Sequence, residues 1–295
     1  MNEISFTKMH GLGNDFIIID AIAQPVSLTK KQIQFLADRN FGIGFDQLLL
    51  IKQSQSPSAD FLYQIFNADG GEADHCGNGA RCLGKFIFDR DLTKKLEITV
   101  ETKNRKIRIK RNSDSLISVD MGAPTFSPSE LGFKAPEQLV TYHRNLELKN
   151  KPALQILFSA ISMGNPHAIV LVESIDTEEV EGVGKALSEH PDFTRQVNVG
   201  FLQPISKTAA SLRVFERGVG ETLACGTGAC AAMVAGRVLG IFQEEVVLQL
   251  NGGPLKIKWK GTSQAAKDSV VMTGDATEVF NGSFDIVNFQ KDLET

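Results

Sequence analysis

Hydrophobic positions along the chain fall mainly into short runs of strand length. Residues 16–19 and 48–51 are continuous apolar segments, a pattern typical of β-strands. Residues 98–100, 106–110 and 116–120 are short and partly alternating, which predicts a meander. Further strands are predicted at residues 154–162, 168–172, 197–202, 211–215, 246–250, 255–259 and 269–272. The chain is therefore expected to consist largely of β-sheet.

Helical patterns are few. Thr29 is a suitable N-cap for a helix over residues 30–39, and residues 180–188 predict another. Residues 227–236 are small or apolar on every face, which indicates a buried helix. The many strands and few helices predict an α+β fold, in which a curved, mostly antiparallel sheet wraps around a central helix.

The sequence contains an internal repeat. Residues 66–80 match residues 215–229 at a constant offset of 149, and residues 13–18 match residues 164–169 at an offset of 151. Matches in the same order at nearly the same offset indicate two copies of one domain. Chance similarity between glycine-rich turns is the alternative.

The repeat predicts two pseudo-symmetric domains. We expect the first at residues 1–123 and the second at residues 124–276. Residues 123–129 are rich in Pro and Ser and form the candidate linker. A length of 295 residues suits two domains of ordinary size.

Composition and charge narrow the possible functions. Hydrophobic residues make up 42% and charged residues 22% of the chain, which indicates a globular protein and excludes a disordered chain or a fibre. The net charge of −4, without a basic block, argues against nucleic-acid binding. No apolar run is long enough to span a membrane, and the first residues do not resemble an export signal. We therefore expect the four cysteines to be free thiols in the cytoplasm.

Two cysteines occupy equivalent positions in the repeat. Cys76 and Cys225 each precede a Gly-x-Gly that opens a predicted helix. The unpaired N–H groups and the dipole at a helix N-terminus bind carboxylates. The same field is expected to lower the pKa of each thiol from about 8.5 towards neutrality. Each copy therefore offers a reactive sulfur beside a carboxylate cradle.

Facing thiols suggest an inversion reaction. If the two halves face each other, a bound amino acid has one thiol on each face of its α-carbon. One thiolate then removes the α-proton while the opposite thiol delivers another, which inverts the stereocentre. Helix N–H groups would stabilise the carbanion, so neither a metal nor a pyridoxal cofactor is needed.

The remaining cysteines point to no other chemistry. Cys82 and Cys230 lie inside the predicted helices, and we expect both to be structural. The chain has no Cys-x-x-Cys, which argues against a zinc site and against a thioredoxin-like centre. We therefore predict no metal and no cofactor.

Seven segments spanning nearly the whole chain resemble the diaminopimelate epimerases. They are residues 6–16, 42–47, 67–70, 76–82, 163–167, 216–218 and 224–231. The resemblance implies a cofactor-independent epimerase that interconverts LL- and meso-diaminopimelate in lysine and peptidoglycan precursor synthesis. It also implies a homodimer, and a C-terminal tail, residues 277–295, that returns to the first domain.

The resemblance also implies a set of site residues. Cys76 and Cys225 would be the catalytic pair. Glu216 would hold an ammonium group or poise Cys225, and His167 would orient or deprotonate Cys76 unless it is purely structural. The substrate would be bound by Asn14, Gln47, Asn67, Gly77, Asn78, Asn165, Asn198, Glu216, Arg217, Gly226 and Thr227.

Two alternatives remain open from the residues. One is a racemase for another amino acid, such as proline. Asn67, Asn165, Asn198 and Arg217 argue instead for a substrate with a second polar end. The other is a non-catalytic amino-acid-binding protein, although binding alone would not require a matched pair of thiols.

Overall fold

The chain folds into two compact units. This computed structural model describes residues 3–73, 76–149, 151–176, 179–262 and 266–285. The first unit comprises Met1–Val119 and Asp275–Thr295, and the second comprises Asp120–Gly274. The Pro- and Ser-rich segment 123–129 lies in the second unit. Residues 286–295 of the expected tail lie outside the described residues.

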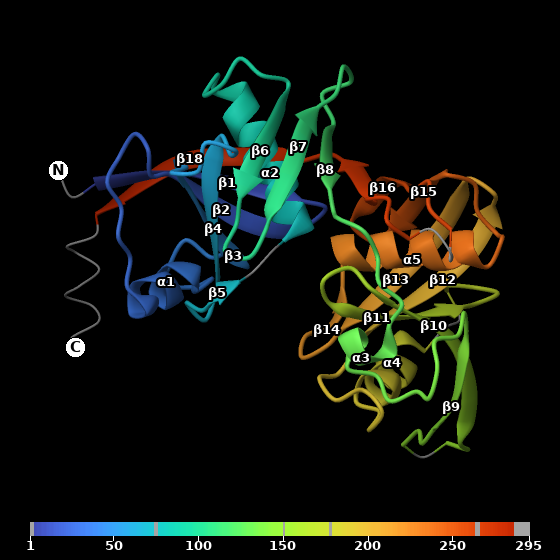
Figure 1. Cartoon of the computed structure of the whole chain (residues 1–295). Helices are drawn as coiled ribbons and strands as arrows, with labels where there is room; N and C mark the ends of the chain where they lie inside the picture. The colour runs from blue at the N-terminus through green and yellow to red at the C-terminus, as the bar shows by residue number, and fades with distance from the viewer. Residues whose placement is uncertain (1–2, 74–75, 150, 177–178, 263–265, 286–295) are drawn as a thin grey trace. The chain divides into compact units, whose positions relative to one another are not determined.

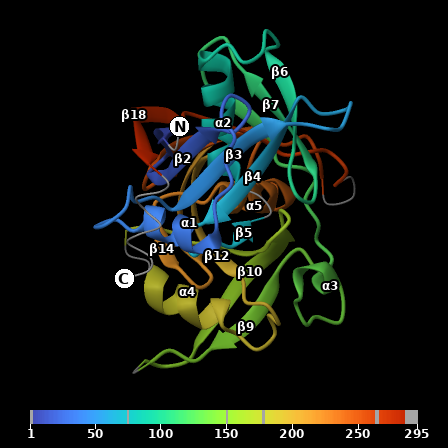
Figure 2. The same ribbon diagram turned by 90° about the vertical axis from the view of Figure 1, so that its left-hand side faces the viewer.

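The first unit contains one mixed sheet. Its strands follow the spatial order β18 (Thr277–Asp285), β1 (Glu3–Gly11), β2 (Asn14–Asp20), β3 (Gln47–Gln53), β4 (Phe61–Asn67), β6 (Glu97–Glu101), β7 (Lys106–Arg111) and β8 (Ile117–Asp120). The short strand β5 (Glu72–Ala73) pairs with β4. Neighbouring strands are antiparallel except at β2–β3 and β4–β6, which are parallel. Figure 2 shows β2, β3 and β4 side by side.

The second unit repeats this arrangement. Its order is β9 (Tyr142–Leu146), β10 (Leu154–Ser162), β11 (Pro166–Leu171), β12 (Asn198–Ser206), β13 (Ala209–Glu216), β15 (Glu245–Leu250), β16 (Gly253–Lys258) and β17 (Val271–Gly274). The short strand β14 (Gly220–Thr222) pairs with β13, as β5 does with β4. The parallel steps, β11–β12 and β13–β15, fall at the same two places. The sequence repeat is therefore a repeat of topology.

One long buried helix lies against each sheet. In the first unit α2 (Gly77–Asp89) contacts β1, β2, β3 and β7. In the second, α5 (Gly226–Val238) contacts β10 to β13, β16 and β17 (Figure 1). Small residues permit the close packing, because a Cβ at Gly84 would lie 2.5 Å from Ile109 Cγ2. The predicted α+β fold with a central helix in each unit is confirmed.

Three shorter helices complete the described fold. They are α1 (Lys30–Ala37), α3 (Pro128–Leu131) and α4 (Val180–Ser188). The helix expected over residues 30–39 begins after the predicted N-cap Thr29 but ends earlier. The Asp38 carboxylate accepts the N–H groups of Asn40 and Phe41 and turns the chain away. No helix in the described part of the chain is long and apolar enough to cross a membrane.

Candidate functional site

In the first unit, three predicted polar residues lie at one end of the sheet. Asn14 begins β2, Gln47 begins β3 and Asn67 ends β4. Because β2 and β3 are parallel and β4 runs the other way, these ends coincide. Gln47 Nε2 donates a hydrogen bond of 2.8 Å to Asn67 Oδ1. Gln47 Oε1 is buried and has no hydrogen-bond partner among the described residues, so it is available to a ligand.

Cys76 joins this group as the N-cap of α2. Its sulfur accepts a hydrogen bond from the Gly79 N–H at 3.4 Å, while the thiol donates to Asn14 Oδ1 at 3.7 Å. Asn78 Nδ2 donates to the same oxygen at 3.3 Å. Gly77 and Asn78 form the first turn of α2. The structure therefore brings Asn14, Cys76 and Asn78 together at a helix N-terminus.

The second unit has a matching group at the same end of its sheet. Asn165 directly precedes β11, Asn198 begins β12 and Glu216 ends β13. His167 lies opposite Asn198 in the parallel pair β11–β12. The backbone N–H of Arg217 donates to Asn198 Oδ1 at 3.0 Å. These residues come from the strands equivalent to those that position Asn14, Gln47 and Asn67.

Cys225 is the N-cap of α5 and is buried. Its sulfur lies 3.6 Å from Thr227 Oγ1, and Thr227 and Gly226 form the first turn of α5. Burial and the Glu216 carboxylate raise the pKa of the Cys225 thiol well above its usual value. The expected lowering of its pKa is therefore wrong for this thiol, because desolvation and a neighbouring negative charge outweigh the field of the helix.

The Glu216 side chain is held in place by a neighbouring strand. Thr222 Oγ1, at the end of β14, donates a hydrogen bond of 2.6 Å to Glu216 Oε1. Sequence reasoning did not identify Thr222, since its role depends on the pairing of β14 with β13. The carboxylate of Glu216 interacts with the Cys225 thiol.

His167 is fully buried and is a weak base. Burial and the nearby Arg217 lower the pKa of its imidazole to about 3, so the ring is neutral near pH 7. Its Nε2 lies 3.1 Å from Asn165 Oδ1, within hydrogen-bonding distance. Its Nδ1 is buried without a hydrogen bond in the described part of the chain. This geometry suits a residue that orients Asn165 better than one that removes a proton.

The other two cysteines lie within the helices. Cys82 in α2 and Cys230 in α5 are both fully buried, and burial raises the pKa of the Cys82 thiol. Inert, protonated thiols are expected in such surroundings. Among the residues that the structure describes, no group of three His, Cys, Asp or Glu is arranged to hold a metal ion.

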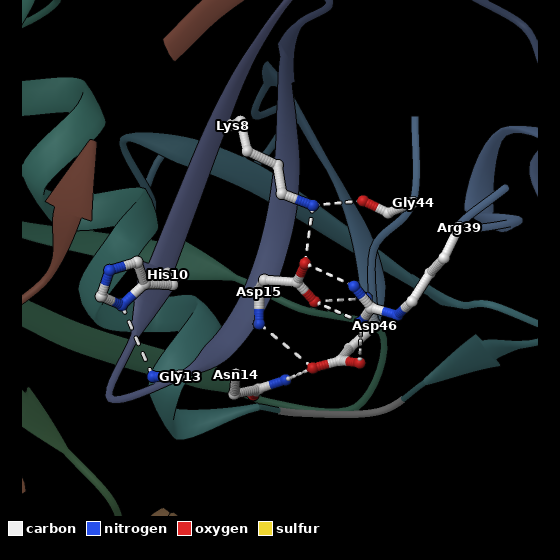
Figure 3. Close-up of polar contacts among 8 residues, drawn as sticks. All are labelled: Lys8, His10, Gly13, Asn14, Asp15, Arg39, Gly44 and Asp46. Carbon is white, nitrogen blue, oxygen red and sulfur yellow. Dashed lines mark hydrogen bonds and ion pairs between the residues drawn. The ribbon is translucent and has the colours of Figure 1, made fainter. Parts of the chain in front are cut away.

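Asn14 contacts a network of charged side chains, and sequence reasoning did not identify this network. Figure 3 shows Asp46 and Asp15 bridged by Arg39, with Lys8 on the far side of Asp15. Asn14 Nδ2 donates to Asp46 Oδ2 at 2.8 Å. The pairing of β2 with β3 brings Asp15 and Asp46 together, and the pairing of β1 with β2 places Lys8 beside Asp15.

The sequence matches one protein family over most of its length. The diaminopimelate epimerase family matches residues 6–127 and 159–279. The diaminopimelate epimerase of Thioalkalivibrio sulfidiphilus is 49% identical over 285 residues, which are 96% of this chain and 100% of that protein. The diaminopimelate epimerase of Nitrosomonas europaea is 50% identical over 284 residues, again 96% of this chain and 100% of the relative.

Solved structures share the fold at low sequence identity. A Bacillus anthracis phenazine biosynthesis protein of the PhzF family has a TM-score of 0.67 and 20% identity, covering 96% of this chain and 99% of that one. A hydroxyproline epimerase from Agrobacterium vitis has a TM-score of 0.66 and 12% identity, covering 97% and 93%. Similarity at this level shows a common architecture.

Proposed function

The chain belongs to the diaminopimelate epimerase family, and from this premise we propose that it interconverts LL-2,6-diaminopimelate and meso-diaminopimelate. The observation that supports this most is the matched pair Cys76 and Cys225, each the N-cap of the central helix of its own unit. The proposal places the enzyme in the cytoplasm, as a homodimer, in the synthesis of lysine and peptidoglycan precursors.

The chemistry is a two-base inversion. A proton must leave one face of the α-carbon while another arrives on the opposite face, so two acid–base groups are required. Cys76 and Cys225 fill these roles, with thiolate as base and thiol as acid. The N–H groups of Gly77, Asn78 and their counterparts on α5 bind the reacting carboxylate and stabilise charge as the carbanion develops. The proposed reaction therefore uses no metal and no cofactor.

The surroundings of Cys225 fit a proton donor. Its raised pKa keeps the sulfur protonated, ready to deliver a proton to the carbanion. In the reverse direction Cys225 must lose its proton, and the Glu216 carboxylate is the neighbouring acceptor. His167, neutral and within hydrogen-bonding distance of Asn165, orients that amide towards the substrate in this account.

Diaminopimelate has an amino-acid group at each end, so its binding requires polar groups beyond the reacting centre. Arg217 offers a planar fork for the distal carboxylate. Its Nη1 donates to the Arg195 carbonyl oxygen at 2.9 Å and its backbone N–H to Asn198, contacts that hold the residue in place. Gln47 Oε1, which has no hydrogen-bond partner among the described residues, is an acceptor for an ammonium group of the substrate.

The direct test is conversion of the substrate. Purified protein without added cofactor is incubated with LL-diaminopimelate, and the isomers are separated by chiral chromatography. We expect the meso isomer to accumulate until the two isomers reach equilibrium. L-Proline should not be racemised at a comparable rate. Folded protein that leaves LL-diaminopimelate unchanged would overturn the proposed activity, whereas equally rapid racemisation of L-proline would overturn the assignment of the substrate.

A further inference from the structure

The amide of Asn14 has a defined orientation in the structure. The oxygen and the NH₂ group of an Asn amide have nearly the same shape, so the hydrogen-bond partners determine the orientation of the amide. Asn14 Oδ1 faces the Cys76 thiol and Asn78 Nδ2, which both donate to it. Asn14 Nδ2 points the other way and donates to Asp46 Oδ2 at 2.8 Å.

Asp46 is the group that can impose this choice. An ionised carboxylate only accepts hydrogen bonds, so it favours the amide nitrogen of Asn14 on its own side. Asn78, by contrast, carries both a donor and an acceptor and could adapt to either orientation of Asn14. The Asp46 carboxylate therefore determines that an oxygen, and not an NH₂ group, is presented to Cys76.

The Asp46 carboxylate is itself fixed from two sides (Figure 3). Its Oδ2 also accepts the backbone N–H of Asp15 at 3.1 Å, and Asp15 Oδ1 accepts the backbone N–H of Asp46 at 3.0 Å. Arg39 Nη2 bridges the two carboxylates, at 2.7 Å from Asp46 Oδ1 and 2.8 Å from Asp15 Oδ1. The guanidinium thus offsets the repulsion between two adjacent negative charges.

Asp15 anchors this arrangement to the interior. Its side chain is only 16% exposed and pairs with Lys8 Nζ at 2.6 Å. Lys8 Nζ also donates to the carbonyl oxygen of Gly44, in the segment that leads to Asp46. Gly44 has a φ of +75°, a conformation that favours glycine. Two carboxylates and two cations therefore form a neutral, cross-linked support behind Asn14.

The second unit does not have this pair of carboxylates at the equivalent positions. At the offset of 151, Asp15 and Asp46 correspond to Pro166 and Val197, neither of which has an ionisable side chain. The amide equivalent to that of Asn14 belongs to Asn165, and its Oδ1 lies 3.1 Å from His167 Nε2. The two halves thus use different groups to orient equivalent amides.

From these contacts we propose that Asp46 is a positioning residue: held by Arg39 and Asp15, it fixes the Asn14 amide with its oxygen towards the Cys76 thiol. The proposal rests on the proposed function, in which Asn14 and Cys76 contact the substrate. The carbonyl oxygen of Asn14 stabilises the protonated sulfur. A flipped amide would present an N–H group and stabilise the thiolate instead.

The test measures the reactivity of Cys76 without any substrate. Cys76 is the only one of the four thiols that is not buried, so alkylation by iodoacetamide, mapped by peptide mass, reports on it. The buried groups Tyr63 and Cys82 interact with Cys76, and burial raises the pKa of both, so they stay neutral near pH 8. Neither group therefore changes its charge in this pH range, and the pH profile reports the ionisation of the Cys76 thiol.

Asp46→Asn keeps the shape of the side chain but no longer specifies the orientation of Asn14. We expect alkylation of Cys76 near pH 8 to become about threefold faster, with the midpoint of its pH profile about half a pH unit lower. In an Asn14→Ala background the same substitution should change neither value. Asn14→Ser replaces Asn14→Ala if the latter lowers the melting temperature.

Asp91→Asn is the matched control. It removes the same charge from an exposed residue that pairs only with Lys94 among the described residues. Its φ of 53° is one that Asn tolerates. We expect it to leave both Cys76 measurements and epimerisation unchanged, whereas Asp46→Asn should lower kcat/KM about tenfold by misplacing Asn14.

The outcomes separate this proposal from the proposed function. An unchanged Cys76 profile in Asp46→Asn, or an equal change with and without Asn14, would overturn the positioning role. If the alkylation results are as expected but the protein does not act on diaminopimelate, the positioning role stands and the proposed reaction is refuted.

Discussion

The thiol of Cys225 is buried beside the carboxylate of Glu216, and burial and that carboxylate together raise its pKa. A helix N-terminus favours the thiolate, yet here the environment favours the protonated sulfur. Glu216 thus favours the protonated form of Cys225, and in the proposed reaction its carboxylate is also the group that accepts the proton.

Replacing Glu216 by Gln should separate these two effects. Glu216→Gln removes the negative charge, so the pKa of Cys225 should fall, while the loss of a proton acceptor should lower kcat about a hundredfold. The ultraviolet absorbance of the thiolate as a function of pH, compared between Cys76→Ala and Cys76→Ala/Cys225→Ala backgrounds, measures the first effect, and turnover of LL-diaminopimelate measures the second. An unchanged kcat would show that Glu216 takes no part in proton transfer.

The two N-cap cysteines should be essential, unlike those within the helices. Cys76→Ala and Cys225→Ala should each reduce turnover at least about a thousandfold without unfolding the protein, because each face of the α-carbon needs its own group. Cys82→Ala and Cys230→Ala are the matched controls. They should retain most activity while losing about 1 kcal/mol of stability from a small cavity. Full turnover by either N-cap variant would contradict the two-base reaction.

The start of α2 should tolerate no side chain at Gly79. A Cβ there would lie 2.6 Å from the Tyr63 hydroxyl oxygen, inside van der Waals contact. Gly79→Ala should therefore lower the free energy of unfolding by about 1–3 kcal/mol. Urea denaturation measures this loss.

The Tyr63 hydroxyl supplies the control for that experiment. It is buried with no hydrogen-bond partner among the described residues, so Tyr63→Phe alone should cost little stability. In Gly79→Ala/Tyr63→Phe the close contact disappears, and most of the loss should be recovered. If the changes in the free energy of unfolding of the two single variants simply add in the double variant, the contact between residue 79 and the Tyr63 hydroxyl does not cause the loss of stability.

The ion pairs of Asp15 predict an acid-sensitive contribution to stability. Burial alone would raise the pKa of Asp15, but the hydrogen bonds and charges of Arg39 and Lys8 outweigh it and hold the pKa well below its usual value. A depressed folded-state pKa stabilises the fold above the unfolded value of about 3.9, and this contribution is lost as pH falls further. Asp15→Asn should therefore cost about 2 kcal/mol at pH 7 and clearly less at pH 3, measured by urea denaturation. An equal loss of stability at both pH values would show that the charge of the Asp15 carboxylate does not contribute to stability.

Local patterns predicted much of the fold. The helix expected over residues 180–188 is α4, because Val180, Val183 and Leu187 recur at helical spacing and are buried. The central helices follow from the Cys-Gly-x-Gly starts and the apolar residues after them. Strands β1, β4, β5, β9, β14 and β18 were not predicted. In β18, Val279 and Phe280 are exposed, and the strand is stabilised by pairing with β1, at the other end of the sequence.

Site residues could be predicted as far as the repeat aligned them. Gln47 and Asn198 occupy equivalent positions in sequence and begin equivalent strands in the structure. The pKa of Cys225 could not be predicted, because it depends on burial and on the contact with Glu216. The link between Asn14 and Asp46 was missed for a similar reason: it arises from the pairing of β2 with β3.

Hydrogen isotope transfer tests the two-base claim most directly. In deuterium oxide, during the first few per cent of conversion of LL-diaminopimelate, two opposed thiols should place solvent deuterium on the α-carbon of the meso product. The remaining LL substrate should stay unlabelled, because its own proton is held by the other thiol. Mass spectrometry of the separated isomers measures both. Early meso product that retains the substrate's own α-hydrogen, or equal early labelling of both isomers, would contradict the two-cysteine mechanism.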